Sequence, residues 1–248
     1  MTKILILPDI HGRQFWKEAV EKHFNEVDKI IFLGDYLDRY ENEGISRKEE
    51  IENFEEIIDF KKNNQDKVIL LTGNHDFHYI SPNFTRSTRY NSNKAYHIKE
   101  MFNSHKSFFK LAHEETINGK KILFTHAGLM NSWYDRNKNT IGDLTTENLN
   151  KLPSINMGVA VLGELSSYRS WIGEKSGSIL WSDIREKIDK NSTEDNIIPN
   201  EDSIVEEYDY QIFGHTQLNM HPIITDKWVC LDCRRAFILN EKGKIENA

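Results

Sequence analysis

Five short segments of this 248-residue chain bring together carboxylate, imidazole and amide side chains. The five segments are Asp9-Ile10-His11, Gly34-Asp35-Tyr36-Leu37-Asp38-Arg39, Gly73-Asn74-His75-Asp76, His126-Ala127-Gly128 and Gly214-His215-Thr216. Taken singly, each of these residues has an ordinary role in a turn, a helix cap or a protein core. Oxygen and imidazole ligands in combination suit manganese, iron and zinc. Five such segments in one chain therefore indicate a hydrolytic site with two metal ions.

Two neighbouring metal ions place a specific demand on their ligands. Ions about 3.5–4 Å apart need a ligand that bridges them, and they can then hold both ends of an in-line displacement at phosphorus. Asp35 is the natural bridge, because a carboxylate has two oxygens to share between the ions. Asp9 and His11 alternate along an extended segment, so both can approach one ion if the chain turns there. The remaining ligands of the second ion would be Asn74, His126 and His215.

Apolar runs precede these segments and predict the elements that position them. We expect strands at residues 3–7, 29–33, 67–72, 121–124, 211–213, 228–231 and 236–239. Helical spacing of apolar residues predicts helices over 14–24 and 46–63, and Ser46 with Glu49 forms a capping box for the second. Strands that alternate with helices indicate right-handed βαβ units and a mainly parallel sheet. Functional groups in such sheets gather beyond the carboxyl ends of the strands, where all five segments lie.

The rest of the chain is less regular. The second half of 81–115 is expected to be helical, and the polar, turn-rich stretch 82–93 to be a loop near the site. Residues 130–207 are interpreted as a lid or specificity insertion within a single domain that spans 1–248, since their tryptophans argue against disorder. The tail, 241–248, is expected to fray.

Composition and charge limit the function classes. The formal net charge of −7 argues against a general nucleic-acid surface. No run approaches the length of a membrane span, and no leader-like segment precedes the first strand, so we expect a cytoplasmic protein without membrane contact. Cys230 falls on the predicted strand 228–231, where a zinc or redox turn is not expected, and no second cysteine pair completes a zinc set. We therefore expect Cys230 and Cys233 to be buried, reduced thiols. The sequence does not indicate an oligomeric state.

The segments from Asp9 to His215 resemble the motifs of the calcineurin-like metallophosphoesterase superfamily, and within it the phosphoprotein-phosphatase branch with its bacterial and phage relatives. The resemblance implies an α/β fold in which two central mixed β-sheets are sandwiched between helices. It implies two divalent metal ions, with manganese expected first and iron or zinc as alternatives. The first ion would be bound by Asp9, His11 and Asp35. The second would be bound by Asp35, Asn74, His126 and His215.

The same resemblance implies catalytic roles. His75 is similar to the general acid of the family, paired with Asp38, and Arg39 is similar to a phosphate-binding arginine. The reaction would be direct attack on phosphorus by a metal-bridging hydroxide, without a covalent intermediate. The second phosphate-binding arginine has no clear match. Leu180-Trp181-Ser182-Asp183 resembles a family block, which makes Arg185 a candidate and Arg169 its rival.

The chain departs from the superfamily pattern at two further places. Gly214-His215-Thr216-Gln217 lacks the second histidine of the common Gly-His-x-His motif, which favours the phosphoprotein-phosphatase-like branch. Tyr40 stands where a glycine usually follows Asp-Arg, so the loop on the phosphate side is crowded. His78 stays unassigned. Arg234 and Arg235 either reach the substrate or form a structural ion pair.

These observations favour a phosphomonoesterase, with phosphoserine or phosphothreonine in proteins as the first substrate. The alternative is a hydrolase of dinucleoside polyphosphates. A nuclease or cyclic phosphodiesterase is less favoured, because the final histidine of Gly-His-x-His is missing and the chain is acidic. A non-catalytic scaffold is less favoured because the ligand set and His75 are intact. The expected partner is therefore a phosphorylated substrate, either a phosphoprotein or a small phosphoester or nucleotide.

Overall fold

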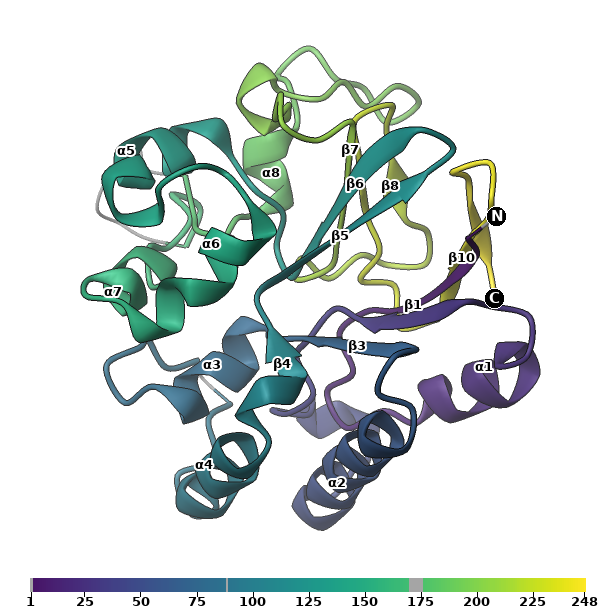
Figure 1. The fold of residues 1–248 in the computed structure, drawn as a ribbon, viewed down its shortest axis with the longest axis vertical. Coiled ribbons are helices and arrows are strands. Elements are labelled where there is room, and N and C mark those ends of the chain that lie inside the picture. Colours follow the sequence, from purple (N-terminus) through teal and green to yellow (C-terminus); the bar gives the residue numbers. More distant parts are fainter. Residues whose placement is uncertain (1, 88, 170–175) are drawn as a thin grey trace. The chain divides into compact units, whose positions relative to one another are not determined.

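The structure, a computed structural model, describes residues 2–87, 89–169 and 176–248 (Figure 1). The chain divides into two compact units, of which the first comprises Met1–Lys110 with Arg234–Ala248 and the second comprises Leu111–Cys233. Each unit holds one mixed β-sheet with helices beside it. The predicted α/β class with two mixed sheets flanked by helices is therefore confirmed.

The sheet of the first unit has the strand order β11-β10-β1-β2-β3-β4. Its strands are β1 (Ile4–Leu7), β2 (Lys29–Phe32), β3 (Val68–Leu71), β4 (Phe109–Lys110), β10 (Phe237–Leu239) and β11 (Ile245–Asn247). The four strands β1 to β4 run parallel, and β10 pairs antiparallel with β1. Ile31 is in register with Ile6 on one side and Ile69 on the other, so β1, β2 and β3 end level with one another.

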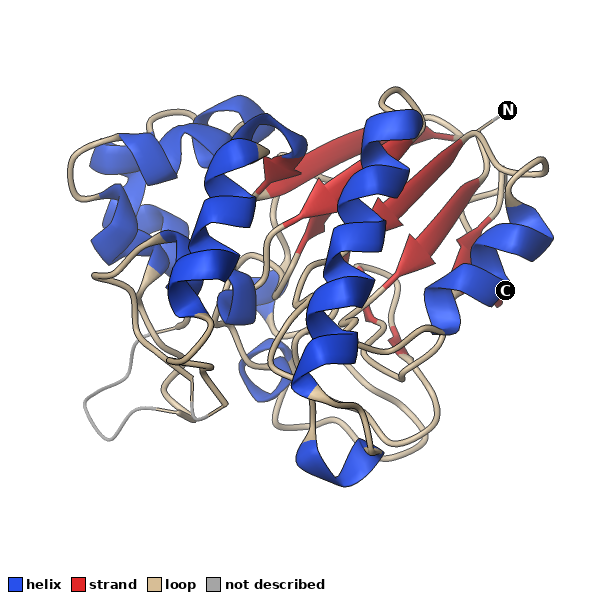
Figure 2. Cartoon of the chain, turned by 90° about the horizontal axis from the view of Figure 1, so that it is seen from below, coloured by secondary structure: helices blue, strands red, loops and turns tan. Residues whose placement is uncertain are grey.

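The helices of the first unit are α1 (Phe15–His23), α2 (Arg47–Asn63), α3 (Asn74–Ile80) and α4 (Ala95–Ser104), with 3-10 turns η1 (Glu41–Glu43) and η2 (Lys106–Phe108). The predicted capping box begins α2, since Ser46 Oγ accepts from the Glu49 N–H and the Glu49 carboxylate accepts from the Ser46 N–H. Figure 2 shows helices of this unit in front of its strands. Aromatic side chains join the layers, with the Phe54 ring stacked on Tyr36 at 5.2 Å between centroids.

The second unit contains a sheet with the order β5-β6-β7-β9-β8. Its strands are β5 (Ala112–Ile117), β6 (Lys120–Thr125), β7 (Tyr210–Phe213), β8 (Ile223–Ile224) and β9 (Trp228–Cys230). The central three, β6, β7 and β9, are parallel, and β5 and β8 pair antiparallel at the edges. Cys230 and Cys233 are buried thiols, as predicted.

Two sequence-based expectations are wrong. The helix expected in the second half of 81–115 ends at Ser104, and β4 and β5 follow it. Asn118 and Gly119 both have positive φ and join β5 to β6 as a tight hairpin, a turn for which Asn-Gly is the preferred pair. The tail expected to fray forms β11, which pairs with β10 through Leu239 and Ile245.

Residues 130–207, interpreted as an insertion, contain regular structure. They hold α5 (Asn131–Ile141), α6 (Thr146–Lys151), η3 (Leu152–Ser154), α7 (Gly158–Leu162), α8 (Ile184–Lys187) and η4 (Glu201–Ser203), while 170–175 lie outside the described residues. Trp133 on α5 is fully buried, and its Nε1 donates to the Val161 carbonyl at 3.2 Å. Helices α5 and α7 therefore pack on each other, and a role for the stretch as a lid stays a prediction.

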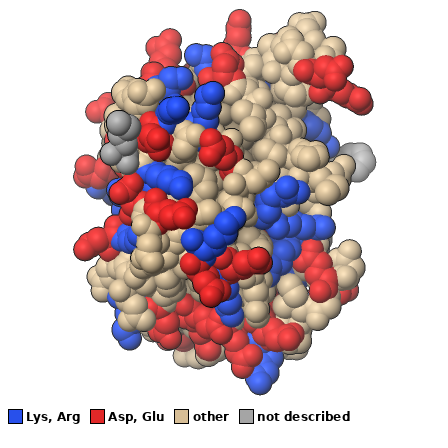
Figure 3. Space-filling view, turned by 90° about the vertical axis from the view of Figure 1, so that its right-hand side faces the viewer, with Lys and Arg blue, Asp and Glu red and all other residues tan. Residues whose placement is uncertain are grey.

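The charge of the surface and the composition of the helices concern the predicted absence of a nucleic-acid surface and of a membrane span. On the face drawn in Figure 3, basic and acidic side chains alternate in small groups. Among the residues that the structure describes, no helix combines the length and the apolar composition that a membrane span requires.

Candidate metal centre

The predicted ligands of the first unit follow neighbouring parallel strands. Asp9 and His11 follow β1, Asp35 follows β2, and Asn74 begins α3 directly after β3. All four side chains are buried. Because the three strands end level, their carboxyl ends meet at one edge of the sheet. Donor atoms of Asp9, His11 and Asp35 lie within 4.8 Å of one another, so the structure brings these three predicted ligands together.

The backbone is strained at several of the predicted site residues. Non-glycine residues with positive φ include Asp9 (32°), His11 (45°), Asp35 (53°), Asp38 (62°) and His215 (67°). Such conformations cost on the order of 1–3 kcal/mol each and persist only where the surroundings hold them. The sequence gives no direct sign of this strain, because none of these residues is a glycine.

Asp76 holds the strained loop after β2. Its fully buried carboxylate accepts N–H bonds from Gly73 at 2.8 Å, Asp35 at 2.7 Å and Tyr36 at 2.9 Å. The Asp35 carboxylate in turn accepts from the His75 N–H at 2.9 Å. The first turn of α3 therefore orients the proposed bridging ligand. The sequence pattern alone does not assign Asp76 a role. A carboxylate three residues after Gly73 is nevertheless a capping signal.

The surroundings of His11 fit a metal ligand. Its Nδ1 lies 2.7 Å from the Leu37 carbonyl oxygen, which can only accept, so Nδ1 carries the hydrogen and Nε2 keeps a lone pair. Nε2 is 3.4 Å from the Asp35 carboxylate. Burial lowers the pKa of His11 well below its ordinary value, although Asp35 opposes this shift. The neutral ring with a fixed tautomer is the form that binds metal ions.

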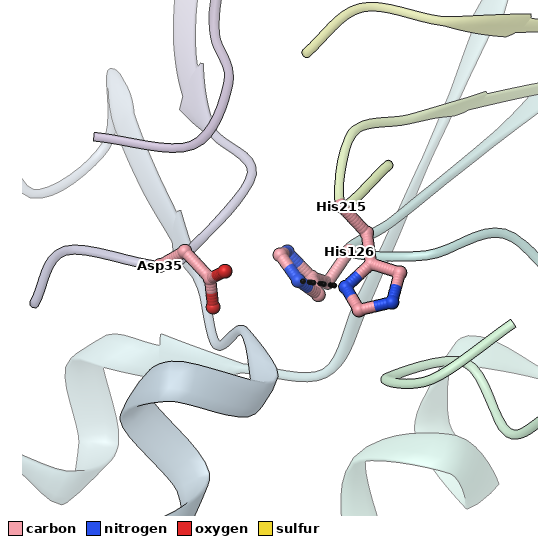
Figure 4. Close-up of side chains that lie close together, drawn as sticks. All are labelled: Asp35, His126 and His215. Carbon is pink, nitrogen blue, oxygen red and sulfur yellow. Dashed lines mark hydrogen bonds between the residues drawn. The ribbon is translucent and has the colours of Figure 1, made fainter. Parts of the chain in front are cut away.

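In the second unit, His126 follows β6 and His215 follows β7, which are adjacent parallel strands. The Gly214 N–H donates to the His126 carbonyl at 2.8 Å, which brings the two turns together. His126 Nε2 is 3.1 Å from His215 Nδ1, and Figure 4 shows this contact along with the side chain of Asp35. Two nitrogens that each lie about 2.0–2.1 Å from one ion are about 3.0–3.4 Å apart. The histidine pair therefore also fits a metal ion.

The predicted family block packs beside His215. The Trp181 ring meets the His215 ring edge-on at 5.9 Å, and the Ile184 N–H donates to Thr216 Oγ1 at 3.2 Å. Residues 180–184 thus support the turn that carries the histidine. This contact explains why a block without metal ligands belongs to the site pattern.

Both arginines considered as the second phosphate ligand pair with Asp183. Arg185 donates to the two carboxylate oxygens at 2.8 and 2.9 Å, and Arg169 Nε lies 3.6 Å from one of them. Burial alone would raise the pKa of Asp183, but the hydrogen bonds from Arg185 outweigh it and hold the pKa below the ordinary value. Two donors of Arg185, Nε and Nη2, are therefore already engaged by Asp183.

His75 and Asp38 form the predicted pair, with Nδ1 of His75 2.8 Å from the carboxylate. Asp38 is fully buried and also accepts from the Tyr79 hydroxyl at 2.6 Å and the Ser87 hydroxyl at 3.0 Å, while His78 Nε2 lies 3.0 Å away. Burial alone would raise the pKa of Asp38, but the bonds from His75 and His78 outweigh it and hold it well below its usual range. His78, unassigned from the sequence, thus helps to keep Asp38 ionised.

Arg39 fits the predicted binding of an anion. Its backbone N–H donates to Glu50 Oε1 at 2.6 Å, which fixes the position of the residue. Its side-chain Nε is buried and has no hydrogen-bond acceptor among the residues described. A buried guanidinium donor of this kind can bind an oxygen of a phosphate group without first losing a protein partner.

The chain is similar to known proteins in sequence pattern and in fold. A model of the calcineurin-like phosphoesterase family matches residues 2–218. A protein serine/threonine phosphatase from Saccharomyces cerevisiae has a similar structure, with a TM-score of 0.58 and 13% identity over 99% of this chain and 79% of that chain. An archaeal phosphodiesterase gives a TM-score of 0.40 with 14% identity over 100% of this chain and 99% of that one. None of the curated proteins matches. At this identity, the yeast structure shows a shared fold.

Proposed function

The chain belongs to the calcineurin-like phosphoesterase family, and we propose that it hydrolyses phosphate monoesters. The family implies a metal-dependent phosphoester hydrolase with a dinuclear divalent centre, and the described residues include Asp and His clusters that could bind metal ions. The observation that carries the proposal is the cluster of Asp9, His11 and Asp35, in which the His11 tautomer leaves Nε2 available.

Each predicted ligand has a place in the proposed centre. The first ion would be held by Asp9, His11 and Asp35, and the second by Asp35, Asn74, His126 and His215. Manganese is our first choice, and iron and zinc suit the same donors. When bound, two divalent ions would lower the pKa of a water molecule and withdraw charge from the phosphoryl oxygens.

The remaining residues would act on the substrate itself. Arg39 would bind the phosphoryl group through its unpartnered guanidinium donor. His75 would donate a proton to the leaving oxygen, with Asp38 orienting the ring through Nδ1. Arg185 would add a second phosphate contact if it released Asp183.

The substrate we place first is phosphoserine or phosphothreonine in proteins, because Gly214-His215-Thr216-Gln217 follows the pattern of the phosphoprotein-phosphatase branch. A dinucleoside polyphosphate is the second candidate. Arg89, whose Nη2 lies 3.1 Å from His75 Nε2, favours it, since anhydride substrates carry additional phosphate charge.

A competition assay tests the proposal. Metal-free protein is reloaded with manganese and offered a phosphoserine/phosphothreonine peptide library together with diadenosine tetraphosphate, and products are read by mass spectrometry. Dephosphorylated peptides would support the first substrate class, and cleaved nucleotide the second. Asp35→Asn, which alters the proposed bridging ligand, is the control and should abolish either activity. Absence of turnover despite bound manganese, with phenyl phosphate also uncleaved, would contradict the proposed function.

A further inference from the structure

Arg89, in the loop between α3 and α4, lies against the proposed general acid. Its Nη2 is 3.1 Å from His75 Nε2, the ring nitrogen opposite the one that meets Asp38. An arginine can only donate, so Nε2 accepts in this structure, and it must give up this bond and take up a proton before His75 can act as the general acid. The other terminal nitrogen, Nη1, is buried and has no acceptor within the described part of the chain. A buried cationic donor therefore lies beside Nε2 of the proposed general acid.

The loop that carries Arg89 is tied to the same carboxylate as His75. On one side of Arg89, the Ser87 hydroxyl donates to Asp38 at 3.0 Å. On the other side, the Asn91 N–H donates to the Tyr79 hydroxyl at 2.7 Å, and that hydroxyl donates to Asp38. Arg89 is thus positioned from both sides.

Tyr40 provides a platform for this guanidinium. The Arg89 guanidinium carbon lies 3.6 Å from the centroid of the Tyr40 ring, and those of Arg13 and Arg234 lie 5.1 and 5.8 Å from it. Glu43 pairs with Arg13 at 2.7 Å and with Arg234 at 3.3 Å. One carboxylate therefore neutralises part of the charge of two arginines, and Arg89 is not among them.

We propose that Arg89, stacked on Tyr40, binds a second phosphate group on the leaving side of the substrate. This inference rests on the proposed phosphoesterase activity, and of the two candidate substrate classes it favours the second, the phosphoanhydrides. A planar fork of donors suits two oxygens of one phosphate, whereas an alcohol offers a single neutral oxygen. Around Tyr40, the additional charge of Arg13 and Arg234 favours an anionic leaving group over a neutral one.

The chemistry balances without any further reactant. A water oxygen forms a bond to the terminal phosphorus, and the bond from that phosphorus to the bridging oxygen breaks. The electron pair of the broken bond stays on the bridging oxygen, so the leaving phosphate gains negative charge, and one proton of the water passes to solvent. Arg89 stabilises the charge that develops on the leaving phosphate. Its contribution is larger for this group than for an alkoxide that is protonated as it leaves.

The test compares tripolyphosphate with phenyl phosphate on the manganese-loaded full chain. Arg89→Gln should reduce kcat/KM for tripolyphosphate about 30-fold or more, as expected for loss of a charged hydrogen bond. The loss for phenyl phosphate should be at least about tenfold smaller. The matched control is Arg86→Gln. Arg86 lies in the same loop and is exposed, and its guanidinium carbon lies 4.8 Å from the centroid of the Tyr90 ring. This variant should leave kcat/KM unchanged for both substrates.

A binding measurement separates this inference from the proposed function. By calorimetry, metal-free wild-type protein should bind pyrophosphate at least about tenfold more tightly than inorganic phosphate, and Arg89→Gln should lose this preference. Equal losses on both substrates, or an unchanged pyrophosphate preference, would overturn the subsite. Absence of turnover by the metal-loaded wild type would overturn the proposed function, and calorimetry would still decide the subsite. If Arg89→Gln does not fold, Arg89→Lys, which keeps the charge and loses the fork, takes its place.

Discussion

Asp76 accepts the backbone N–H of Asp35 at 2.7 Å, and this bond holds the proposed bridging ligand in a left-handed backbone conformation with φ of 53°. Replacing Asp76 by Asn turns an acceptor oxygen into a donor that faces other donors. We expect Asp76→Asn to lower the free energy of unfolding by about 2–4 kcal/mol. Urea unfolding of the metal-free protein measures this loss. The exposed Asp66→Asn is the control, and equal stability of the two variants would contradict the role of Asp76.

The hairpin between β5 and β6 offers a test of backbone conformation alone. Gly119 has a φ of 75°, and a Cβ added there would meet nothing within 4 Å. Gly119→Ala should therefore destabilise the chain by about 1 kcal/mol through its left-handed conformation. Gly119→Asn should cost less, because asparagine tolerates this region. Thermal unfolding of the two variants makes the comparison, and an alanine variant as stable as the wild type would refute the assignment of the turn.

The sequence could predict that the proposed ligands lie together, because each follows a buried apolar run. Asp9, Asp35 and Asn74 come directly after strands that lie side by side, so the order of elements was enough to bring them together. Regular periodicity likewise predicted α2 with its cap at Ser46. The hairpin at Asn118 was not predicted, because apolar and aromatic residues in the second half of 81–115 suggested that this stretch was helical. The strand β5, which leads into the hairpin, was therefore not expected.

Contacts made by loops could not be predicted in the same way. Ser87 and Arg89 reach Asp38 and His75 from a segment without periodicity, and no local pattern encodes a pairing across so many residues. His78 also contacts this loop, because its Nδ1 accepts from the Ser87 N–H, and its Nε2 lies near Asp38. Its role could therefore not be predicted either. The departure at Tyr40 was visible in the sequence, but the arginines stacked on its ring come from three separate segments.

Lys187 gives the second unit a defined dependence on pH. Its side chain is fully buried, with Nζ 3.4 Å from the Leu129 carbonyl, and burial lowers its pKa from 10.5 to about 8. Between these values the folded chain binds fewer protons at this site than the unfolded chain. The contribution of Lys187 to the free energy of unfolding should therefore rise with pH across this window, by at most about 3 kcal/mol.

Urea unfolding from pH 7 to 10.5 measures this rise as the difference between wild type and Lys187→Met. The methionine variant should lack the increase, and the exposed Lys190→Met should retain it. A difference that stays constant across the range would show that the folded and unfolded chains bind the same number of protons at this amine, and that burial does not lower its pKa.

The proposed ligand sets predict distinct metal contents. Removing a histidine ligand of the second ion should leave the first set intact, so His126→Ala should reduce manganese from about two ions to about one per chain. Asp35→Asn should weaken both ions, because this carboxylate is the proposed bridge. Mass spectrometry of metals after dialysis provides the count. The exposed His97→Ala should bind as the wild type does, and two ions retained in His126→Ala would remove that residue from the ligand set.

His75 can be tested apart from the ligands, because its ring meets Asp38 and Arg89 while its neighbour Asn74 is the proposed ligand. His75→Asn should bind manganese as the wild type does. It should lose about 10²–10⁴-fold in turnover of alkyl phosphates, whose leaving groups need a proton. For p-nitrophenyl phosphate, whose leaving group departs readily as an anion, the loss should be much smaller. A loss of the same size on both substrates would assign His75 to substrate positioning, and undiminished turnover of alkyl phosphates would exclude it as the acid.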